Sequence, residues 1–366
     1  MDCKITINGK NIAAIEGDLL LKVLEKMGDP VPHLCYDPRF PASASCRLCL
    51  VEIEGTKNPV CSCVAVVQSG MKIKTHTQAL EQYREIELKM LGRDCSKESP
   101  LAQYMKSYKI QGYRDISESK FSDQSHPYIA VNMDRCITCF RCVHICDQVQ
   151  GEFVWRIVGR GPESQIRPGS SATLQASACV SCGACVDTCP TGALEDHTIA
   201  RAPKKPDQWI RTICPYCGVG CELEAGVAQD KIIGIKPSIE GPSNKGHLCA
   251  KGRYAFSYVD ADDRVTTPMV RVGGRWKKTG WDEALNVAAD SLKKIIKSHG
   301  GDSIGVMASA RATNEDSFLA QKFARVVLGT NNVDCCARVC HAPTAAGMSR
   351  VFGTGVATNS FNDIEK

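Results

Sequence analysis

One cysteine pattern, C-x2-C-x2-C-x3-C, occurs twice in the chain and restricts its fold more than any other feature of the sequence. The eight cysteines of the two runs are Cys136, Cys139, Cys142, Cys146, Cys179, Cys182, Cys185 and Cys189. Three closely spaced thiolates and a distant fourth suit a cluster of four irons, and in such a repeat the fourth cysteine of each run binds the other cluster. We therefore expect two 4Fe-4S clusters with exchanged ligands, one on Cys136, Cys139, Cys142 and Cys189 and the other on Cys179, Cys182, Cys185 and Cys146.

Zinc is the alternative metal for these runs, but zinc sites use two separated pairs of ligands. The chain has 22 cysteines in 366 residues, which is typical of a secreted disulfide framework or of an intracellular metal carrier. Its first residues show no basic segment followed by an apolar one, and no apolar run of about 18 residues occurs. We therefore expect a cytoplasmic protein with reduced thiols and no membrane span. The net charge of +5 is spread along the chain, so no nucleic-acid partner is expected.

The N-terminal segment predicts a small β-grasp domain, in which a hairpin is followed by a helix. Residues 4–7 and 11–15 have the apolar content of strands, and Asn8-Gly9 between them is a strong hairpin signal. Asp18 stands where it can cap a short helix that ends at Gly28.

Two further cysteine groups flank the repeated runs. The first reads Cys35-x10-Cys46-x2-Cys49-x13-Cys63, with Cys61 competing for the fourth position. It resembles the 2Fe-2S ferredoxin-like domain at the start of complex I large iron-sulfur subunits, iron-only hydrogenases and cytoplasmic formate dehydrogenases. The resemblance implies a 2Fe-2S cluster and favours Cys63 as the fourth ligand. His33, just before Cys35, is interpreted as an ordinary loop histidine.

The second group reads Cys214-x2-Cys217-x3-Cys221-x27-Cys249, and its spacing alone also fits a zinc ribbon. With its continuation "CAKG" it resembles the 4Fe-4S domain of molybdopterin oxidoreductases. The resemblance implies a third 4Fe-4S cluster, and it places Lys251 between that cluster and the pterin. Without the resemblance, Lys251 is an ordinary solvated lysine.

The segment "NVDCCARVCHAPTAAG" resembles the active-site segment of formate dehydrogenases, in which a cysteine or selenocysteine binds molybdenum or tungsten and a histidine follows it. The resemblance implies that Cys340 is the metal ligand and His341 its catalytic partner. A soft thiolate suits such a metal, and a neighbouring imidazole can take up a proton. Cys335 and Cys336 have no role in that pattern and are expected to be small buried residues.

The full order predicts a multidomain α+β protein. We expect a β-grasp 2Fe-2S domain, a degenerate His-Cys3 cluster segment, a ferredoxin-like domain with two 4Fe-4S clusters, a small 4Fe-4S domain and an incomplete α/β molybdopterin oxidoreductase domain, at residues 1–78, 79–125, 126–200, 207–263 and 264–366. The degenerate segment keeps Cys95 but lacks the other ligands that relatives carry, so its cluster is expected to be absent. In the last segment, helices are expected after a capping box at Thr279 and Asp282 and after a cap at Thr313.

The resemblance implies the N-terminal part of a formate dehydrogenase catalytic subunit. Its cofactors would be one 2Fe-2S cluster, three 4Fe-4S clusters and a molybdenum- or tungsten-bis(molybdopterin guanine dinucleotide). Family members continue for several hundred residues, so the chain is expected to be a fragment or to be completed by a second polypeptide. Electrons from formate would pass to an NAD-, ferredoxin- or hydrogenase-linked subunit. The alternatives are a non-catalytic iron-sulfur subunit of a formate dehydrogenase, hydrogenase or complex I-like assembly, and a metal-storing or zinc-structural protein.

Overall fold

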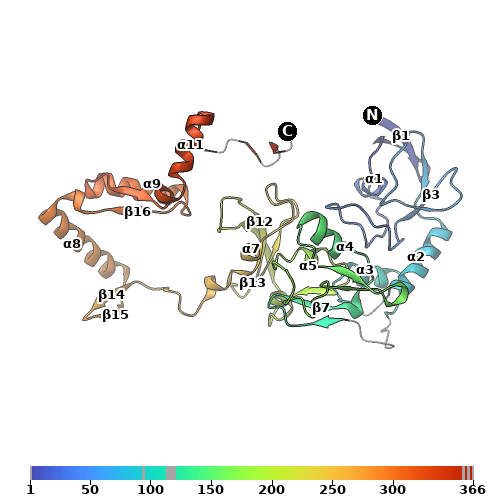
Figure 1. Cartoon of the computed structure of the whole chain (residues 1–366), viewed down its shortest axis with the longest axis horizontal. Coiled ribbons are helices and arrows are strands. Elements are labelled where there is room, and N and C mark those ends of the chain that lie inside the picture. Colours follow the sequence, from blue (N-terminus) through green and yellow to red (C-terminus); the bar gives the residue numbers. More distant parts are fainter. Residues whose placement is uncertain (1, 93–94, 113–120, 357–358, 361–362, 365–366) are drawn as a thin grey trace. The chain divides into compact units, whose positions relative to one another are not determined.

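The computed structural model describes residues 2–92, 95–112, 121–356, 359–360 and 363–364. These residues form two compact units (Figure 1). The first contains the chain up to residue 212 together with 223–241 and 245–255, and the second contains 213–222, 242–244 and the chain from 256 onward. None of the helices in the described part of the chain combines the length and the apolar character that a bilayer span requires.

The first unit begins with a five-stranded sheet. Its strands are β1 (Asp2–Ile7), β2 (Lys10–Ile15), β3 (Leu50–Ile53), β4 (Val60–Cys61) and β5 (Lys72–Lys74), in the order β2-β1-β5-β3-β4. β1 runs antiparallel to β2 and parallel to β5. Helix α1 (Leu20–Lys26) buries its leucines against the isoleucines of β1 and β5, which gives this domain its core.

The predicted hairpin is confirmed, because Asn8 and Gly9 both adopt left-handed backbone angles, with φ of 48° and 83°. The predicted cap at Asp18 is wrong. The carbonyl of Asp18 accepts a hydrogen bond from the Val67 amide, and Leu19 occupies the N-cap position without a side-chain hydrogen bond. Pairing with the distant segment at Val67 therefore decides where this helix begins.

Two helices follow the β-grasp sheet, α2 (Gln78–Leu91) and α3 (Pro100–Ser107), capped by Thr77 and Ser99. Their buried leucines pack against the loop that carries Cys35 and Cys46. The backbone amides of Ser96 and Leu101 donate to the carbonyls of Thr191 and Pro190 at 3.0 and 3.2 Å. Within the segment expected to lack a cluster, the described residues of α2 and α3 therefore pack against two cysteine-bearing regions.

The next part of the first unit holds the two repeated cysteine runs. Its sheet has the order β10-β7-β6, formed by β6 (Ser122–Asp123), β7 (Ile129–Asn132) and β10 (Leu194–Asp196). A separate hairpin pairs β8 (Arg156–Val158) with β9 (Gln165–Arg167). The helical segments are α4 (Arg141–His144), a π-helical turn at Ile145–Val149, α5 (Ala184–Thr188), α6 (His197–Ala200) and short 3-10 turns at Met133–Arg135 and Gly161–Glu163. Trp155, 1% exposed, is the largest side chain in the core between them.

A three-stranded sheet then follows in the order β11-β12-β13, formed by β11 (Gln208–Ile213), β12 (Glu222–Ala228) and β13 (Lys231–Pro237). Helix α7 (Ala250–Tyr254) packs against β13. Cys249 is the N-cap residue of α7, and its sulfur lies 3.5 Å from the amide nitrogen of Gly252.

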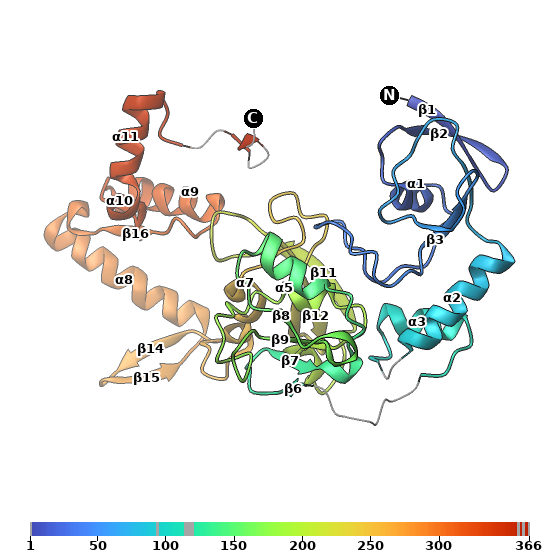
Figure 2. The same cartoon turned by 45° about the vertical axis from the view of Figure 1, so that its right-hand side comes forward.

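The C-terminal part of the second unit begins a parallel α/β arrangement (Figure 2). Its elements are the 3-10 turn Ser257–Asp260, the hairpin β14 (Met269–Val272) and β15 (Arg275–Lys278), α8 (Trp281–His299), the 3-10 turn Gly301–Ser303, β16 (Val306–Ala308), α9 (Asn314–Lys322), a π-helical turn at Phe323–Leu328, β17 (Val333–Cys335), α10 (Ala337–Cys340) and α11 (Ala342–Phe352). β16 and β17 pair in parallel.

The predicted cap at Thr313 is confirmed, because its hydroxyl oxygen accepts a hydrogen bond from the Asp316 amide. The capping box at Thr279 and Asp282 is wrong. The N-cap of α8 is Gly280, the Thr279 amide donates to the Pro268 carbonyl, and the Thr279 hydroxyl donates to the Glu283 carboxylate. The backbone of Thr279 is thus hydrogen-bonded beside the β14–β15 hairpin, and the helix begins one residue later than the capping box predicts.

Candidate metal centres

The N-terminal cysteine group forms a nest of thiols between two loops of the β-grasp domain. Cys35, Cys46, Cys49 and Cys63 are each at most 2% exposed. The thiols of Cys35, Cys46, Cys49, Cys61 and Cys63 lie close enough together to shift one another's pKa values. The backbone turns through left-handed angles at Ala44 and Arg47, with φ of 52° at both.

Neighbouring thiols stabilise thiolates within this nest. The neighbouring thiols of Cys61 and Cys63 lower the pKa of Cys49, and those of Cys46 and Cys63 lower the pKa of Cys35. Cys63 is a neighbour of both Cys35 and Cys49, whereas the main neighbour of Cys61 is Cys49. Buried sulfurs held next to thiolates fit a 2Fe-2S cluster, because its irons are bound by thiolates.

His33 lies beside this nest, with Nδ1 3.3 Å from the Val31 carbonyl and Nε2 3.7 Å from the Glu25 carboxylate. These partners agree with its interpretation as a loop histidine.

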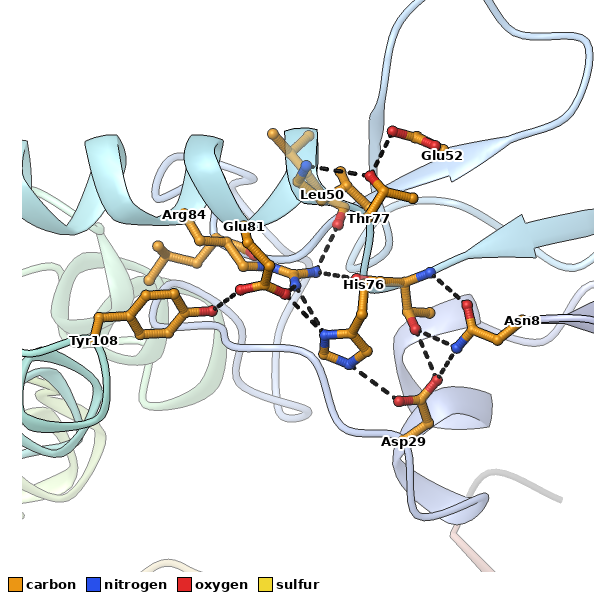
Figure 3. Close-up of polar contacts among 12 residues, drawn as sticks. Asn8, Asp29, Leu50, Glu52, His76, Thr77, Glu81, Arg84 and Tyr108 are labelled. Carbon is orange, nitrogen blue, oxygen red and sulfur yellow. Dashed lines mark hydrogen bonds and ion pairs between the residues drawn. The ribbon is translucent and has the colours of Figure 1, made fainter.

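Arg84 fixes the strand that leaves the nest (Figure 3). Its side chain is fully buried, and it donates to the carbonyls of Leu48, Leu50 and Thr75 at 3.2, 3.0 and 2.8 Å. The Glu81 carboxylate lies 2.5 Å from the Arg84 guanidinium and also accepts a hydrogen bond from the hydroxyl of Tyr108. Through Arg84, helix α2 holds the backbone on either side of Cys49.

The two repeated runs line two small cavities in the first unit. The ligand set Cys136, Cys139, Cys142 and Cys189 lines one cavity together with Ile137 and Pro190. The set Cys146, Cys179, Cys182 and Cys185 lines the other cavity together with Trp155. The structure therefore brings together the two exchanged sets that the spacing predicts.

Cys139, Cys146 and Cys185 are buried, and the other five cysteines of the two sets are half-buried. Burial, followed by the charge of Cys189, raises the pKa of Cys139 to about 12, and burial also raises the pKa of Cys142 and of Cys185. A buried thiolate needs a cationic partner to offset its desolvation, and iron ions supply one. The chemistry of these sulfurs therefore fits 4Fe-4S clusters. Nowhere in the described part of the chain do three metal-binding side chains gather around a point that one metal ion could occupy.

The third 4Fe-4S ligand set is divided between the two units. Cys214, Cys217 and Cys221 lie in the second unit, where the Cys214 amide donates to the Cys221 carbonyl at 2.8 Å. Cys249 lies in the first unit at the start of α7, and Lys251 is exposed on that helix.

Helix α7 is anchored to the second cysteine run by Arg253, which sequence reasoning did not single out. This arginine is 2% exposed and donates two hydrogen bonds of 2.6 Å to Asp187, the residue two positions after Cys185. Its Nε also donates to Asp196 at 3.3 Å. A side chain at Gly183 would collide with Arg253, since a Cβ atom there would lie 2.5 Å from Nε. The sequence did offer a signal, since Asp187 lies inside the second cysteine run and Arg253 lies just after Cys249, and the two residues carry opposite charges.

Cys340 ends α10 and is exposed, and His341 follows it. His341 Nε2 lies 3.4 Å from the Gly355 carbonyl. No residue of α10 or α11 is buried. Cys335 is half-buried, and Cys336 is exposed with its sulfur 3.5 Å from the Ala310 amide, so the expectation that both are buried is wrong. The thiolate and imidazole fit a thiophilic metal, but the described residues do not enclose them.

Four known family models match successive segments of the chain, in the order that the sequence predicts. Residues 2–78 match a 2Fe-2S iron-sulfur cluster binding domain, and residues 126–195 match the ferredoxin-like domain of NADH-quinone oxidoreductase subunit 3. Residues 207–261 match the molybdopterin oxidoreductase Fe4S4 domain, and residues 264–366 match the molybdopterin oxidoreductase family itself. Residues 207–261 and 264–366 are therefore assigned to molybdopterin oxidoreductase domains.

The chain is similar to proteins named "putative formate dehydrogenase" in Staphylococcus aureus strains USA300 and N315. Each is 29% identical over an alignment of 417 positions, gaps included. The alignment covers 99% of this chain and 42% of the relative. The chain thus spans less than half the length of these relatives. Among solved structures, an NAD+-reducing [NiFe]-hydrogenase in the H2-reduced state is similar with a TM-score of 0.47 and 25% identity, over 53% of this chain and 87% of that one. Acetylene hydratase from Pelobacter acetylenicus is similar with a TM-score of 0.34 and 29% identity, over 38% and 20% of the two chains.

Proposed function

We propose that this molybdopterin oxidoreductase chain is the N-terminal part of a formate dehydrogenase catalytic subunit. The observation that carries the proposal is the Cys340-His341 pair at the end of α10, downstream of four complete sets of cysteine ligands. The names of the relatives, which match nearly the whole chain, support the same reaction. In this proposal formate is converted reversibly to CO2, a proton and two electrons.

In this proposal Cys340 Sγ binds molybdenum or tungsten, which bis(molybdopterin guanine dinucleotide) also holds. Such a centre, when bound, would supply a two-electron acceptor for formate oxidation. His341 moves the proton. In the tautomer whose Nε2–H donates to the Gly355 carbonyl, Nδ1 carries the free lone pair and can accept a proton. Lys251, two residues after Cys249, adds a positive charge near that ligand.

The clusters of the proposal are held by cysteines alone. They are one 2Fe-2S cluster, on Cys35, Cys46, Cys49 and Cys63, and three 4Fe-4S clusters, on the two exchanged sets and on Cys214, Cys217, Cys221 and Cys249. The domain boundaries proposed from the sequence, at residues 78, 125, 200, 207 and 263, separate these sets. The electron acceptor in this proposal is an NAD-, ferredoxin- or hydrogenase-linked subunit.

Exposed apolar side chains on helices of the second unit support the proposal that further chain completes the pterin domain. Leu285 on α8, Phe318 on α9 and Phe352 on α11 are 59%, 63% and 72% exposed. From residue 256 onward, the described side chains that are buried are Val270, Ala324, Leu328 and Thr330. Exposed apolar faces of this kind are usually covered in a folded domain. We propose that further chain, in cis or as a second polypeptide, covers them and encloses the pterin.

The test supplies the corresponding later region of a relative in trans and measures formate oxidation, iron, and molybdenum or tungsten. Cys340→Ser should abolish formate oxidation and lower the molybdenum or tungsten content while the iron content stays unchanged, because a serine hydroxyl is a poor ligand for a thiophilic metal. Cys335→Ser and Cys336→Ser are matched controls that should stay active. Full activity of Cys340→Ser, or formate oxidation by the unaccompanied chain, contradicts the proposal.

The exposure of Cys340 favours a second candidate, a non-catalytic electron-transfer subunit that uses the cluster cysteines alone. Metal analysis separates the two. An electron-transfer subunit itself contains iron without molybdenum or tungsten, and Cys340→Ser leaves the metal content of its complexes unchanged.

A further inference from the structure

A buried carboxylate, Asp37, lies where several cysteine-bearing loops of the first unit meet. It follows Cys35 by two residues and is 2% exposed. Its Oδ1 accepts hydrogen bonds from the backbone amide and Nε of Arg39 at 3.1 and 2.9 Å. Its Oδ2 accepts from the guanidiniums of Arg39 and Arg141 at 2.7 and 3.0 Å, and from the hydroxyl of Thr188 at 2.7 Å.

Each partner of Asp37 belongs to a different ligand loop. Arg141 lies between Cys139 and Cys142, and it also donates to the Leu34 carbonyl at 3.0 Å and to the Thr188 hydroxyl at 2.8 Å. Thr188 immediately precedes Cys189. Asp37 therefore ties the loop of Cys35 to both repeated cysteine runs.

The network continues to the loop that precedes α7. The second terminal nitrogen of Arg39 donates to the Gly246 carbonyl at 3.2 Å, three residues before Cys249. The Ser43 hydroxyl adds a direct bond from the β-grasp loop to the Cys139 carbonyl at 3.1 Å. One ionic network thus touches loops that carry ligands of all four proposed clusters.

The charges of this network do not cancel. One carboxylate faces two guanidiniums, whose side chains are 17% and 15% exposed. The network therefore presents a fixed excess of positive charge beside the cysteine loops. Reduction adds negative charge to a cluster, and nearby positive charge stabilises the reduced form.

We propose that Asp37 is a positioning residue that, with Arg39 and Arg141, holds the cluster loops together and sets the reduction potentials of the adjacent clusters through its charge. The inference rests on the proposed function insofar as these cysteines bind clusters, and it does not depend on formate as the substrate. A role in packing alone would require no particular direction of potential shift. A charge role requires opposite shifts when charges of opposite sign are removed.

The experiment compares the wild-type full chain with Asp37→Asn and Arg39→Gln, each isolated anaerobically with its clusters. Iron and sulfide are measured first, and the midpoint potentials follow from redox titration monitored by EPR. Asp37→Asn removes a negative charge and should shift the potentials of the 2Fe-2S cluster and the nearest 4Fe-4S cluster to more positive values. Arg39→Gln should shift them to more negative values. Glu54→Gln is the matched control, since that carboxylate is 64% exposed on the same domain and should cause no shift.

The outcomes separate this inference from the proposed function. A wild-type chain that binds no iron contradicts the proposed function. A wild-type chain with its clusters and with unchanged potentials in both variants, or with shifts of the same sign, overturns the inference alone. If Asp37→Asn does not retain its clusters, Arg39→Gln decides, because a negative shift supports the charge role and no shift or a positive shift overturns it.

Discussion

Left-handed backbone angles occur at equivalent positions in the two repeated cysteine runs. Thr138 and Ser181, each two residues after the first cysteine of its run, have φ of 54° and 58°. Such angles cost a non-glycine residue about 1 kcal/mol. In return each amide nitrogen lies 3.4 Å from the sulfur of the first cysteine, Cys136 or Cys179. The two loops therefore share one local geometry. Its hydrogen bonds join residues only two apart in sequence, so the repeated cysteine pattern is enough to predict it.

Lys251 is the residue whose role the cysteine pattern leaves open. It is exposed on α7, two residues after Cys249. We predict that Lys251→Met leaves the iron content unchanged but slows reduction of the clusters by formate in the completed enzyme, because removal of a positive charge disfavours electron arrival nearby. Stopped-flow spectroscopy measures this rate. Lys231→Met, an exposed lysine on β13, should match wild type, and equal rates for wild type and Lys251→Met would make Lys251 an ordinary surface residue.

At the scale of elements, α2 and α3 occupy the segment interpreted from the sequence as a degenerate His-Cys3 cluster site. Cys95 is packed among apolar residues there, beside the core formed by Leu88, Leu101 and Met105. Apolar packing and the Arg84 hydrogen bonds hold this segment in place. The sequence predicted helical character and the loss of the cluster, but it gave no indication that α2 binds the backbone around Cys49.

We predict that Arg84→Met destabilises the β-grasp domain by about 3 kcal/mol or more, because three buried carbonyl acceptors lose their donor. The loss of visible circular dichroism from the 2Fe-2S cluster in a urea series measures the change. Lys89→Met is the control on the same helix. Its exposed ion pair with Glu85 contributes about 0.5 kcal/mol or less, so a similar shift for both variants would contradict the role of Arg84.

Both failed cap predictions have the same physical cause. Asp18 and Thr279 are good capping residues by type, but their backbones are already bonded to Val67 and Pro268. Local residue preference therefore predicted that both segments are helical. The backbone hydrogen bonds to Val67 and Pro268 determine where each helix begins.

At the scale of the whole chain, the four ligand sets predict about 14 irons per chain. This number follows from one 2Fe-2S and three 4Fe-4S clusters, since a single thiol at Cys95 cannot hold a fourth cubane. Anaerobic iron and sulfide analysis with EPR of the reduced protein provides the measurement. Cys95→Ser should leave every EPR signal unchanged, and the loss of a cubane signal in that variant would show that the segment binds a cluster after all.

The candidate site was predictable where ligands lie close in sequence and unpredictable where side chains meet across the fold. The spacing of each run predicted which sulfurs line each cavity. The bonds from Asp37 to Arg141 and Thr188 span 104 and 151 residues, and no periodicity or motif encodes contacts at such distances. The ion pair of Arg253 with Asp187 spans 66 residues and was missed for the same reason.

The exchange of Cys146 and Cys189 between the two ligand sets has a consequence for biogenesis. Each set joins one run to the last cysteine of the other, so a bound cluster closes the intervening chain into a ring, as a disulfide does. The first cluster inserted removes most of the chain entropy that the second would otherwise remove. The second insertion is then favoured, and cluster maturation of this region becomes cooperative with its folding.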